Sequence, residues 1–290
     1  MAHKDSYFRK HKEKIQETLG EKVPAVPIII SEEKKLEFET GKVLLIDKPL
    51  HWTSFDVVRK IRNSIRIKKV GHAGTLDPLA SGLLIICTGK FTKKINEYMA
   101  QEKEYTGSFT LGAVTPTFDK ESDPEQQKDF LHLTENEIRE ATAKFTGEIQ
   151  QVPPIYSAIK KQGTALYELA RRGETVELEP RTINVHSFEI TSIELPLVYF
   201  KIVCSTGTYI RSIANDYGAA LGCGGYLSEL RRTRIGEFKV EDGVTIDDFL
   251  QQVQVSVDRG EKVDKVEKVD EIDSVDKVNN DDEAYNPLST

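Results

Sequence analysis

Residues 71–82 read Gly-His-Ala-Gly-Thr-Leu-Asp-Pro-Leu-Ala-Ser-Gly, and they separate a basic, helix-like segment from an apolar run at 83–87 that is typical of a buried strand. Glycines and a proline mark this stretch as a loop in which the backbone turns tightly or another molecule comes close to it. Its only carboxylate, Asp77, precedes Pro78, and a residue before proline is held extended and out of a helix. The loop therefore presents one acid, either to a ligand or, as an Asx-turn, to its own backbone.

Composition places the chain among globular proteins. It has 290 residues, of which 38% are hydrophobic and 30% charged, enough for one large domain or two small ones. The net charge of −7 argues against an RNA partner, but residues 258–290 alone hold eleven acidic and five basic residues, which leaves the rest at −1. Residues 59–70 hold six basic residues and no acid. Such a patch can meet a phosphate backbone, or it can be an ordinary solvated helix face.

The cysteines and the N-terminus indicate the compartment. Cys87, Cys204 and Cys223 lack the spacing of metal ligands and are odd in number, as expected of reduced, buried thiols inside a cell. The N-terminus has no apolar signal-peptide core, and no run approaches the length of a membrane span. We therefore expect a cytoplasmic protein with no membrane partner and no metal.

Three parts can be distinguished along the chain. Residues 1–40 are polar and are expected to form an extension outside the main core, which could add one strand to it. Residues 41–253 mix strands and helices without a strict βαβ rhythm, which predicts an α+β fold with a mixed, largely antiparallel sheet and flanking helices. In residues 254–290 valine or isoleucine recurs every third position between charges, a period that buries no continuous face. This part is expected to be an acidic, low-complexity, disordered tail.

Capping residues and apolar spacing predict the elements of the central part. Thr53 or Ser54 begins a helix to about residue 68, with an inner apolar face of Phe55, Val58, Ile61 and Ile65. Residues 134 and 137 form a capping box for a second helix, and Thr208 is expected to cap a third. Further strands are expected at 42–47, 103–111, 182–195, 197–204 and 227–238, and short helices at 92–100, 165–172 and 245–253.

The loop at 71–82 resembles the signature of the TruB-type pseudouridine synthases, which isomerise uridine in the T-loop of tRNA. A match of twelve residues is far more specific than a lone glycine motif. Further matches follow in the family's order, at 48–54, 115–119 and 207–211. One departure is His51, which stands where the family usually has glycine.

The resemblance implies a pseudouridine-synthase-like catalytic domain over 41–253, with an RNA-clamping insertion near 153–176. It implies a tRNA pseudouridine-55 synthase that flips the target uridine out of the T-loop and breaks and re-forms its glycosidic bond. Since the isomerisation changes no oxidation state and consumes no energy, we expect neither cofactor nor metal. The expected partner is tRNA and the expected state is a monomer.

The resemblance also assigns the site residues. Asp77 corresponds to the nucleophile, Arg211 to the arginine that pairs with it, and Tyr105 to the tyrosine that stacks on the flipped uracil and helps the C5 proton leave. Tyr209 and Leu230 correspond to pocket residues, and His72 to the ring that fills the gap left by the extruded base. From residue type alone, each aromatic could equally be core packing and Arg211 a surface residue.

Two other functions compete with this assignment. A non-catalytic tRNA-binding or folding module would share the basic patches and the pocket but would not need a nucleophile paired with a cation. A glycosidase would be expected to use two working carboxylates, and only Asp77 lies in a recognisable motif. The residues leave the intermediate open between a ribose ester, a base adduct and elimination.

Overall fold

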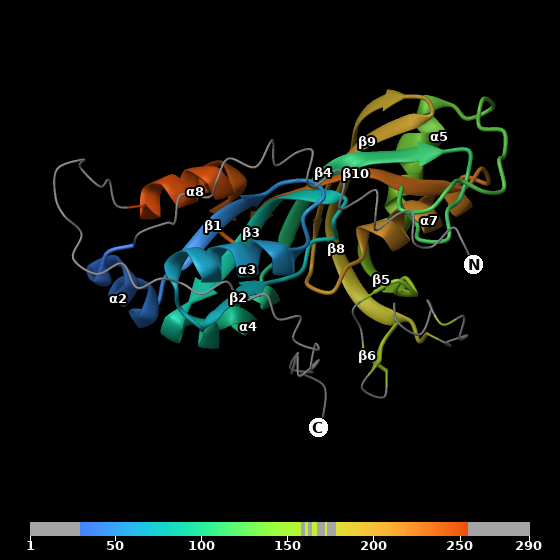
Figure 1. The fold of residues 1–290 in the computed structure, drawn as a ribbon. Helices are drawn as coiled ribbons and strands as arrows, with labels where there is room; N and C mark the ends of the chain where they lie inside the picture. The colour runs from blue at the N-terminus through green and yellow to red at the C-terminus, as the bar shows by residue number, and fades with distance from the viewer. Residues whose placement is uncertain (1–29, 158–159, 162–163, 167–171, 173–177, 255–290) are drawn as a thin grey trace. The chain divides into compact units, whose positions relative to one another are not determined.

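The computed structural model describes residues 30–157, 160–161, 164–166, 172 and 178–254, and its central feature is one sheet of nine strands (Figure 1). Seven strands lie in the order β1-β3-β10-β4-β9-β8-β5, while β2 pairs with β3 and β11 with β10. The strands of this sheet are β1 (Val43–Lys48), β2 (Val70–Ala73), β3 (Ala80–Thr88), β4 (Lys103–Leu111), β5 (Gly147–Gln151), β8 (Arg181–Glu194), β9 (Leu197–Cys204), β10 (Gly225–Ile235) and β11 (Phe238–Lys239). The short strands β6 (Lys160–Lys161) and β7 (Thr164–Ala165) form a separate hairpin.

The helices lie against this sheet. They are α2 (Glu32–Thr40), α3 (Ser54–Ile65), α4 (Ile95–Ala100), α5 (Glu135–Glu140), α7 (Ile210–Ala220) and α8 (Ile246–Val253), with 3-10 turns η1 (Gly89–Lys94), η2 (Ala141–Phe145) and η3 (Val240–Asp242). The hydroxyls of Thr53, Thr134 and Thr245 accept backbone N–H groups at the starts of α3, α5 and α8, as their sequence signals predict. The first two complete the reciprocal capping box.

Strand direction confirms the predicted fold class. Among the pairings of the described strands in this sheet, β3 and β10 run parallel, and the other pairs are antiparallel. The sheet is therefore mixed and largely antiparallel, in an α+β fold. The parallel register sets Leu230 opposite Ala80 and Arg232 opposite Gly82, which places β10 directly beside the start of β3. The loop that carries Asp77 ends at this point.

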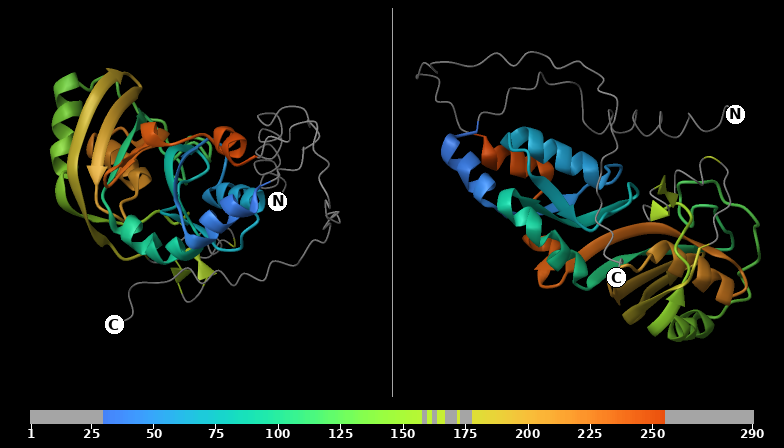
Figure 2. Two further views of the ribbon diagram at one scale, coloured as in Figure 1. Left: turned by 90° about the vertical axis from the view of Figure 1, so that its left-hand side faces the viewer. Right: turned by 90° about the horizontal axis from the view of Figure 1, so that it is seen from below.

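One core lies between β4, β8, β9 and the helices α5 and α7 (Figure 2). Phe109 stacks on Phe200 with ring centroids 4.2 Å apart, and Tyr217 of α7 meets both Phe109 and Phe188. Such aromatic pairs add specific geometry to the burial of apolar area. This core supports the start of α7, which carries Arg211.

A second core joins α2, α3 and α8 to β1 and β3. Phe38 of α2 is buried and packs edge-on against Phe249, with ring centroids 6.1 Å apart. The predicted extension at 1–40 therefore needs correction at its C-terminal end, where residues 32–40 form a helix that belongs to the core. The apolar ring of Phe38 explains the difference, because its burial stabilises the packed helix.

Three local predictions are wrong. The helix that begins at Ser54 ends at Ile65, because Arg66 adopts the left-handed conformation at φ 53°, and its buried stripe contains Val57, Val58 and Ile61 but not Phe55, which is 53% exposed. Thr208 does not cap α7, whose flanking residue Tyr209 instead exchanges hydrogen bonds with the side chain of Gln151.

Several predictions concern residues outside the described part. They include the acidic tail at 254–290 except its first residue, most of the insertion near 153–176, and most of the helix expected at 165–172. Of the residues predicted for that helix, Ala165 lies in β7 instead.

The three cysteines are buried and free, as predicted. In the described ranges, no helix is long and apolar enough to cross a membrane.

The β3–β10 contact leads to a stability prediction. Gly82 has φ +101°, and a methyl group added there would lie 2.3 Å from the carbonyl oxygen of Arg232. Gly147 also has positive φ, +89°, but nothing lies within 4 Å of the corresponding position. Both alanine substitutions incur the left-handed backbone cost of about 1–2 kcal/mol, whereas only Gly82→Ala also forces β10 away from β3.

We therefore expect Gly82→Ala to lower the free energy of unfolding clearly more than Gly147→Ala does. Chemical denaturation of both variants and of the unsubstituted protein measures the difference. Equal losses in the two variants would show that the close contact between β3 and β10 does not contribute to stability.

Candidate active site

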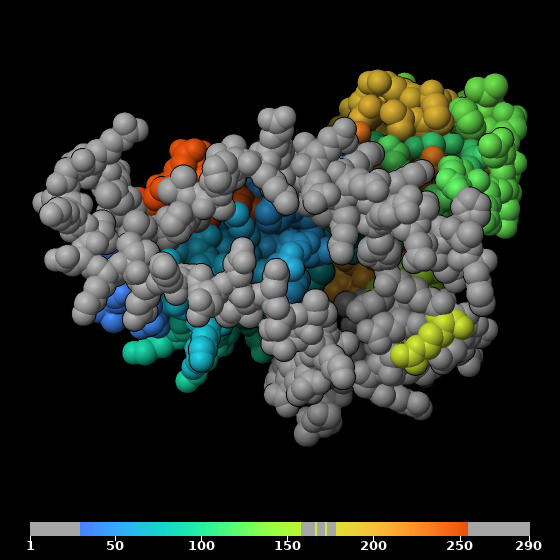
Figure 3. Space-filling model, in the orientation of Figure 1, coloured from blue at the N-terminus to red at the C-terminus, as the bar shows by residue number. Residues whose placement is uncertain are grey.

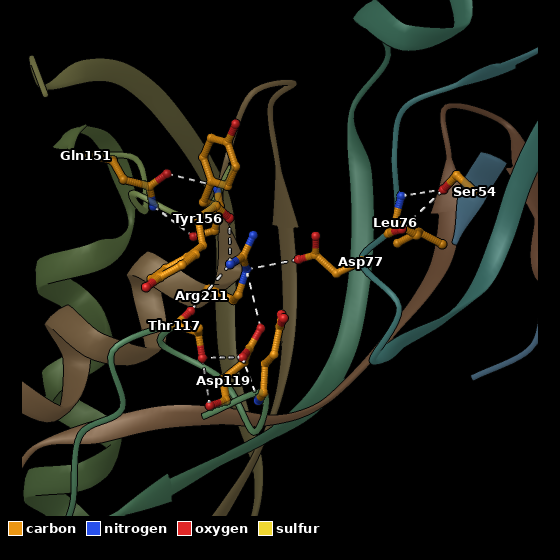
Figure 4. Close-up of polar contacts among 10 residues, drawn as sticks. Ser54, Leu76, Asp77, Thr117, Asp119, Gln151, Tyr156 and Arg211 are labelled. Atoms are coloured by element: carbon orange, nitrogen blue, oxygen red, sulfur yellow. Dashed lines mark hydrogen bonds and ion pairs between the residues drawn. The ribbon is translucent and has the colours of Figure 1, made fainter. Parts of the chain in front are cut away.

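Asp77 lies in the loop between β2 and β3, and its carboxylate faces the first turn of α7 (Figure 4). Asp77 Oδ2 is 2.9 Å from the Nε atom of Arg211. The Asp77 side chain is 41% exposed, whereas that of Arg211 is 6% exposed. The structure thus joins two residues 134 positions apart into an ion pair that is open to solvent on the carboxylate side.

The Arg211 guanidinium is held by several acceptors. Its Nη1 donates to the carbonyl oxygen of Tyr156 at 3.0 Å and to that of Thr117 at 3.4 Å, and its Nε lies 3.7 Å from Asp119 Oδ2. The ion-pair contact with Asp77 is therefore made through Nε, while Nη1 is engaged by the two carbonyl groups. A buried cation needs such partners to offset the loss of hydration.

Asp119 is a functional candidate that the sequence analysis missed. Its side chain is 7% exposed, and its Oδ1 accepts hydrogen bonds from Thr117 Oγ1 at 2.7 Å and from the Glu121 amide at 2.9 Å. Burial raises the pKa of the Asp119 carboxyl, and the Arg211 charge opposes that rise. The only available signal was that Asp119 ends the family-like stretch 115–119.

Arg232 holds the Asp77 loop through hydrogen bonds, and the sequence analysis did not identify it as a candidate site residue. It is 1% exposed, its Nε donates to the Leu83 carbonyl at 2.8 Å, and its Nη2 donates to the Gly74 carbonyl at 3.0 Å. Gly74 precedes Asp77 and Leu83 follows it, so one side chain holds both ends of the loop. Within the described residues Arg232 forms no ion pair with a carboxylate.

Tyr105 and Leu230 lie on neighbouring strands next to this loop. Tyr105 of β4 stands opposite Arg232 of β10, and Leu230 stands opposite Ala80, three residues after Asp77. Tyr105 is 8% exposed. Burial raises the pKa of its hydroxyl, while the charge of Arg232 and a hydrogen bond from it act in the opposite direction.

Tyr209 and His72 occupy different places. Tyr209 precedes Arg211 at the start of α7, and burial raises its pKa while the Arg211 charge opposes the rise. His72 lies on β2 opposite Ile86, and burial lowers its pKa to about 4, so the ring is neutral near pH 7. The contacts of the described residues do not join His72 to the Asp77–Arg211 pair.

Two more side chains support the loop from the preceding segment. Ser54 Oγ accepts from the Leu76 amide at 2.9 Å and donates to the Leu76 carbonyl at 3.2 Å, next to Asp77. Lys48 is fully buried, and its Nζ donates to the Pro49 and Trp52 carbonyls at 2.9 and 2.7 Å. Among the described residues no group of three or more His, Cys, Asp or Glu side chains is placed to hold a metal ion.

Comparison with family models identifies the family. Residues 62–210 match the model of the TruB family pseudouridylate synthase N-terminal domain. Residues 211–272 match that of the tRNA pseudouridylate synthase B C-terminal domain. The first match covers half of the chain and includes Asp77 and Tyr105, and the second begins at Arg211. The chain belongs to the TruB family of pseudouridine synthases, as its sequence predicts.

Individual relatives agree with this assignment. The chain is 52% identical over 225 residues to a tRNA pseudouridine synthase B of Flavobacterium johnsoniae, covering 75% of this chain and 98% of that relative. It is 50% identical over 218 residues to the protein of the same name from Chloroherpeton thalassium, covering 73% and 90%.

Solved structures also resemble the chain. A chain in a Cbf5-Nop10-Gar1 complex is 32% identical with a TM-score of 0.58, covering 80% of this chain and 60% of that one. A chain in an H/ACA RNP bound to a substrate RNA containing 2'-deoxyuridine is 30% identical with a TM-score of 0.56, covering 80% and 59%.

Lys48 gives a prediction for the pH dependence of stability. Burial lowers its pKa from 10.5 to about 7, and Asp77 is the main charge opposing this shift. Between about pH 7 and pH 10.5 the unfolded chain therefore binds more protons at this residue than the folded chain, so its contribution makes folding more favourable as pH rises.

We expect Lys48→Met to flatten the rise of the unfolding free energy between pH 7 and pH 10 relative to the unsubstituted protein. Denaturant titrations of both proteins at several pH values measure the two slopes, and the loss of two hydrogen bonds in the variant shifts its curve without tilting it. Identical slopes would mean that Lys48 keeps an ordinary pKa.

Proposed function

We propose that this chain isomerises uridine to pseudouridine in the T-loop of tRNA, at position 55, with Asp77 as the nucleophile. One observation carries the proposal: a solvent-accessible carboxylate lies 2.9 Å from a buried guanidinium, in a chain of the TruB family. The pairing holds the Asp77 carboxylate in a fixed position, as a carboxylate nucleophile requires. Relatives about 50% identical are named tRNA pseudouridine synthase B.

The reaction sets clear demands on the site. The target base must leave the loop stack before its atoms can be reached, at a cost of a few kcal/mol. The bond from ribose C1′ to N1 then breaks, the base turns, and C1′ bonds to C5, while the C5 hydrogen is released and N1 takes up a proton. The net change is zero in electrons, so this chain's own side chains can supply the acid, base and nucleophile.

Tyr105 and Arg232 are proposed to act together on the base. The Tyr105 ring would offer a stacking surface to the flipped base, and its raised pKa keeps the hydroxyl protonated near neutral pH. The buried Arg232 favours the phenolate form, which Tyr105 must reach by giving up its own proton before its oxygen can accept the proton from C5. Leu230 and Tyr209 would line the same pocket, and the neutral ring of His72 would stack in the RNA where the base had been.

A non-catalytic tRNA-binding module is the second candidate. It would use the same pocket and the same basic surface. The Asp77–Arg211 pair favours the enzyme. A carboxylate placed where RNA phosphates approach weakens RNA binding, so a protein that only binds RNA gains nothing from it. The two candidates differ in one measurable property, the release of hydrogen from C5.

The test uses tRNA transcript that carries tritium at uracil C5. Wild-type protein should release tritium to water, and Asp77→Asn should abolish the release while it retains RNA binding, because the amide has the same shape but is a poor nucleophile. Asp47→Asn is the matched control. It also removes a partly exposed carboxylate from an arginine pair, the one with Arg231, outside the site.

We expect Asp47→Asn to release tritium at the wild-type rate. Release by Asp77→Asn within about tenfold of wild type, equivalent to 1.4 kcal/mol, would contradict the nucleophile assignment. Binding of tRNA by the wild-type chain without any release would favour the non-catalytic module.

A further inference from the structure

Helix α3 has an exposed stripe that its packing does not explain. Its buried side faces the second core through Val57, Val58 and Ile61. At 100° per residue, positions 55, 59 and 62 fall within about 60° of one another on the outer side. They are exposed Phe55, exposed Arg59 and half-buried Arg62, and exposed Arg66 follows one turn later at the helix end. We call these four residues the α3 stripe.

The stripe combines an exposed ring with cations that have few partners. Phe55 is 53% exposed, an unusual position for a large aromatic residue in a folded core helix. Arg59 pairs with Asp56 at 2.7 Å but remains 57% exposed, and such surface pairs contribute little. Within the described part of the chain Arg62 and Arg66 form no ion pair.

The stripe begins at the catalytic loop. Ser54, adjacent to Phe55, exchanges two hydrogen bonds with Leu76, the residue before Asp77. In the turn at residues 50–51, just before α3, Leu50 is 49% exposed. The next residue, His51, donates its amide hydrogen to the Pro78 carbonyl at 2.8 Å. Leu50 and Phe55, which carry these two exposed apolar side chains, are therefore each one position from a residue that is hydrogen-bonded to the Asp77 loop.

From this point α3 leads away from the site, toward the end of the sheet where α2 lies (Figure 1). The chain segment that contains α3 forms part of the molecular surface on the face drawn in Figure 3. From Phe55 to Arg66 the rise is about 16 Å at 1.5 Å per residue. That length corresponds to about five nucleotides at a rise of 3.4 Å per strand.

We propose that the α3 stripe binds the RNA strand next to the target uridine, with Phe55 stacking on a base of the loop and the arginines contacting successive phosphates. This rests on the proposed function for the identity of the RNA. The occupant follows from the chemistry: an aromatic ring suits a nucleobase, guanidinium groups suit phosphates, and the stripe is continuous with the site.

The test measures dissociation constants for a synthetic T-arm stem-loop RNA over a range of KCl concentrations. All proteins carry Asp77→Asn, so that bound RNA is not converted. Arg62→Gln with Arg66→Gln should reduce the slope of log affinity against log salt by about 1.5, since each lost phosphate contact removes about 0.7–0.9. Phe55→Ala should weaken binding by about tenfold with no change in slope, because stacking is not ionic.

Matched control variants distinguish the contribution of the α3 stripe from the effect of removing any two positive charges or any exposed apolar side chain. Lys60 is exposed on the same helix but lies about 160° from Arg62 around it, and exposed Lys144 lies in η2. Lys60→Gln with Lys144→Gln removes the same charge and should leave the slope unchanged. Leu36→Ala removes a 63% exposed apolar side chain of α2 and should leave the affinity unchanged.

An equal loss of slope in the lysine pair would show that only net charge matters and would overturn the proposal. Unchanged or tighter RNA binding by the variant with Arg62→Gln and Arg66→Gln would also overturn the proposal. Unchanged binding is expected if the stripe only faces solvent, and tighter binding if it binds the chain's own acidic residues. Tritium release by wild-type protein is measured beside these titrations. If the wild-type protein releases no tritium but the stripe variants change RNA binding as expected, only the proposed activity is contradicted. If it releases tritium but the stripe variants bind RNA normally, only this inference is contradicted.

Discussion

The buried charge of Arg211 is the constraint on which the site depends. A guanidinium that is 6% exposed must be surrounded by acceptors, and those acceptors come from three separate segments of the chain. Asp77 belongs to the loop before β3, Thr117 and Asp119 to the loop after β4, and Tyr156 to the loop after β5. Satisfying one cation therefore brings these three loops together and leaves one carboxylate, Asp77, open to solvent.

The loop that carries Asp77 is held in place from both sides. Below it, Arg232 bonds to carbonyls on either side of Asp77, and Gly82 allows the backbone of β10 to approach β3 closely. Beside it, Ser54 pairs with the backbone of Leu76. Groups that are positioned before the substrate arrives need little rearrangement during the reaction. The parallel pairing of β3 and β10 is thus part of the site as well as of the fold.

Local sequence signals predicted most elements, because caps and strand patterns act over a few residues, as at Thr53 and Asp56. Asp77 and Arg211 emerged only from the motif, since spacing alone also allowed a turn aspartate and a surface arginine. Arg232 was missed because its bond to Leu83 spans 149 positions, which no local pattern reveals. Phe55 was assigned to the core because it is apolar, but its position on the helix turns it outward.

The central claim is that Arg211 holds the Asp77 carboxylate ready for reaction, and the kcat of Arg211→Lys tests it most directly. Lysine retains the charge but lacks the planar guanidinium, whose separate nitrogens contact Asp77 and the Tyr156 carbonyl. The account predicts a loss of about a hundredfold in the rate of tritium release, the usual effect of removing one electrostatic contact from a site, in a variant that still folds and binds tRNA. A folded Arg211→Lys protein with wild-type kcat would contradict the account.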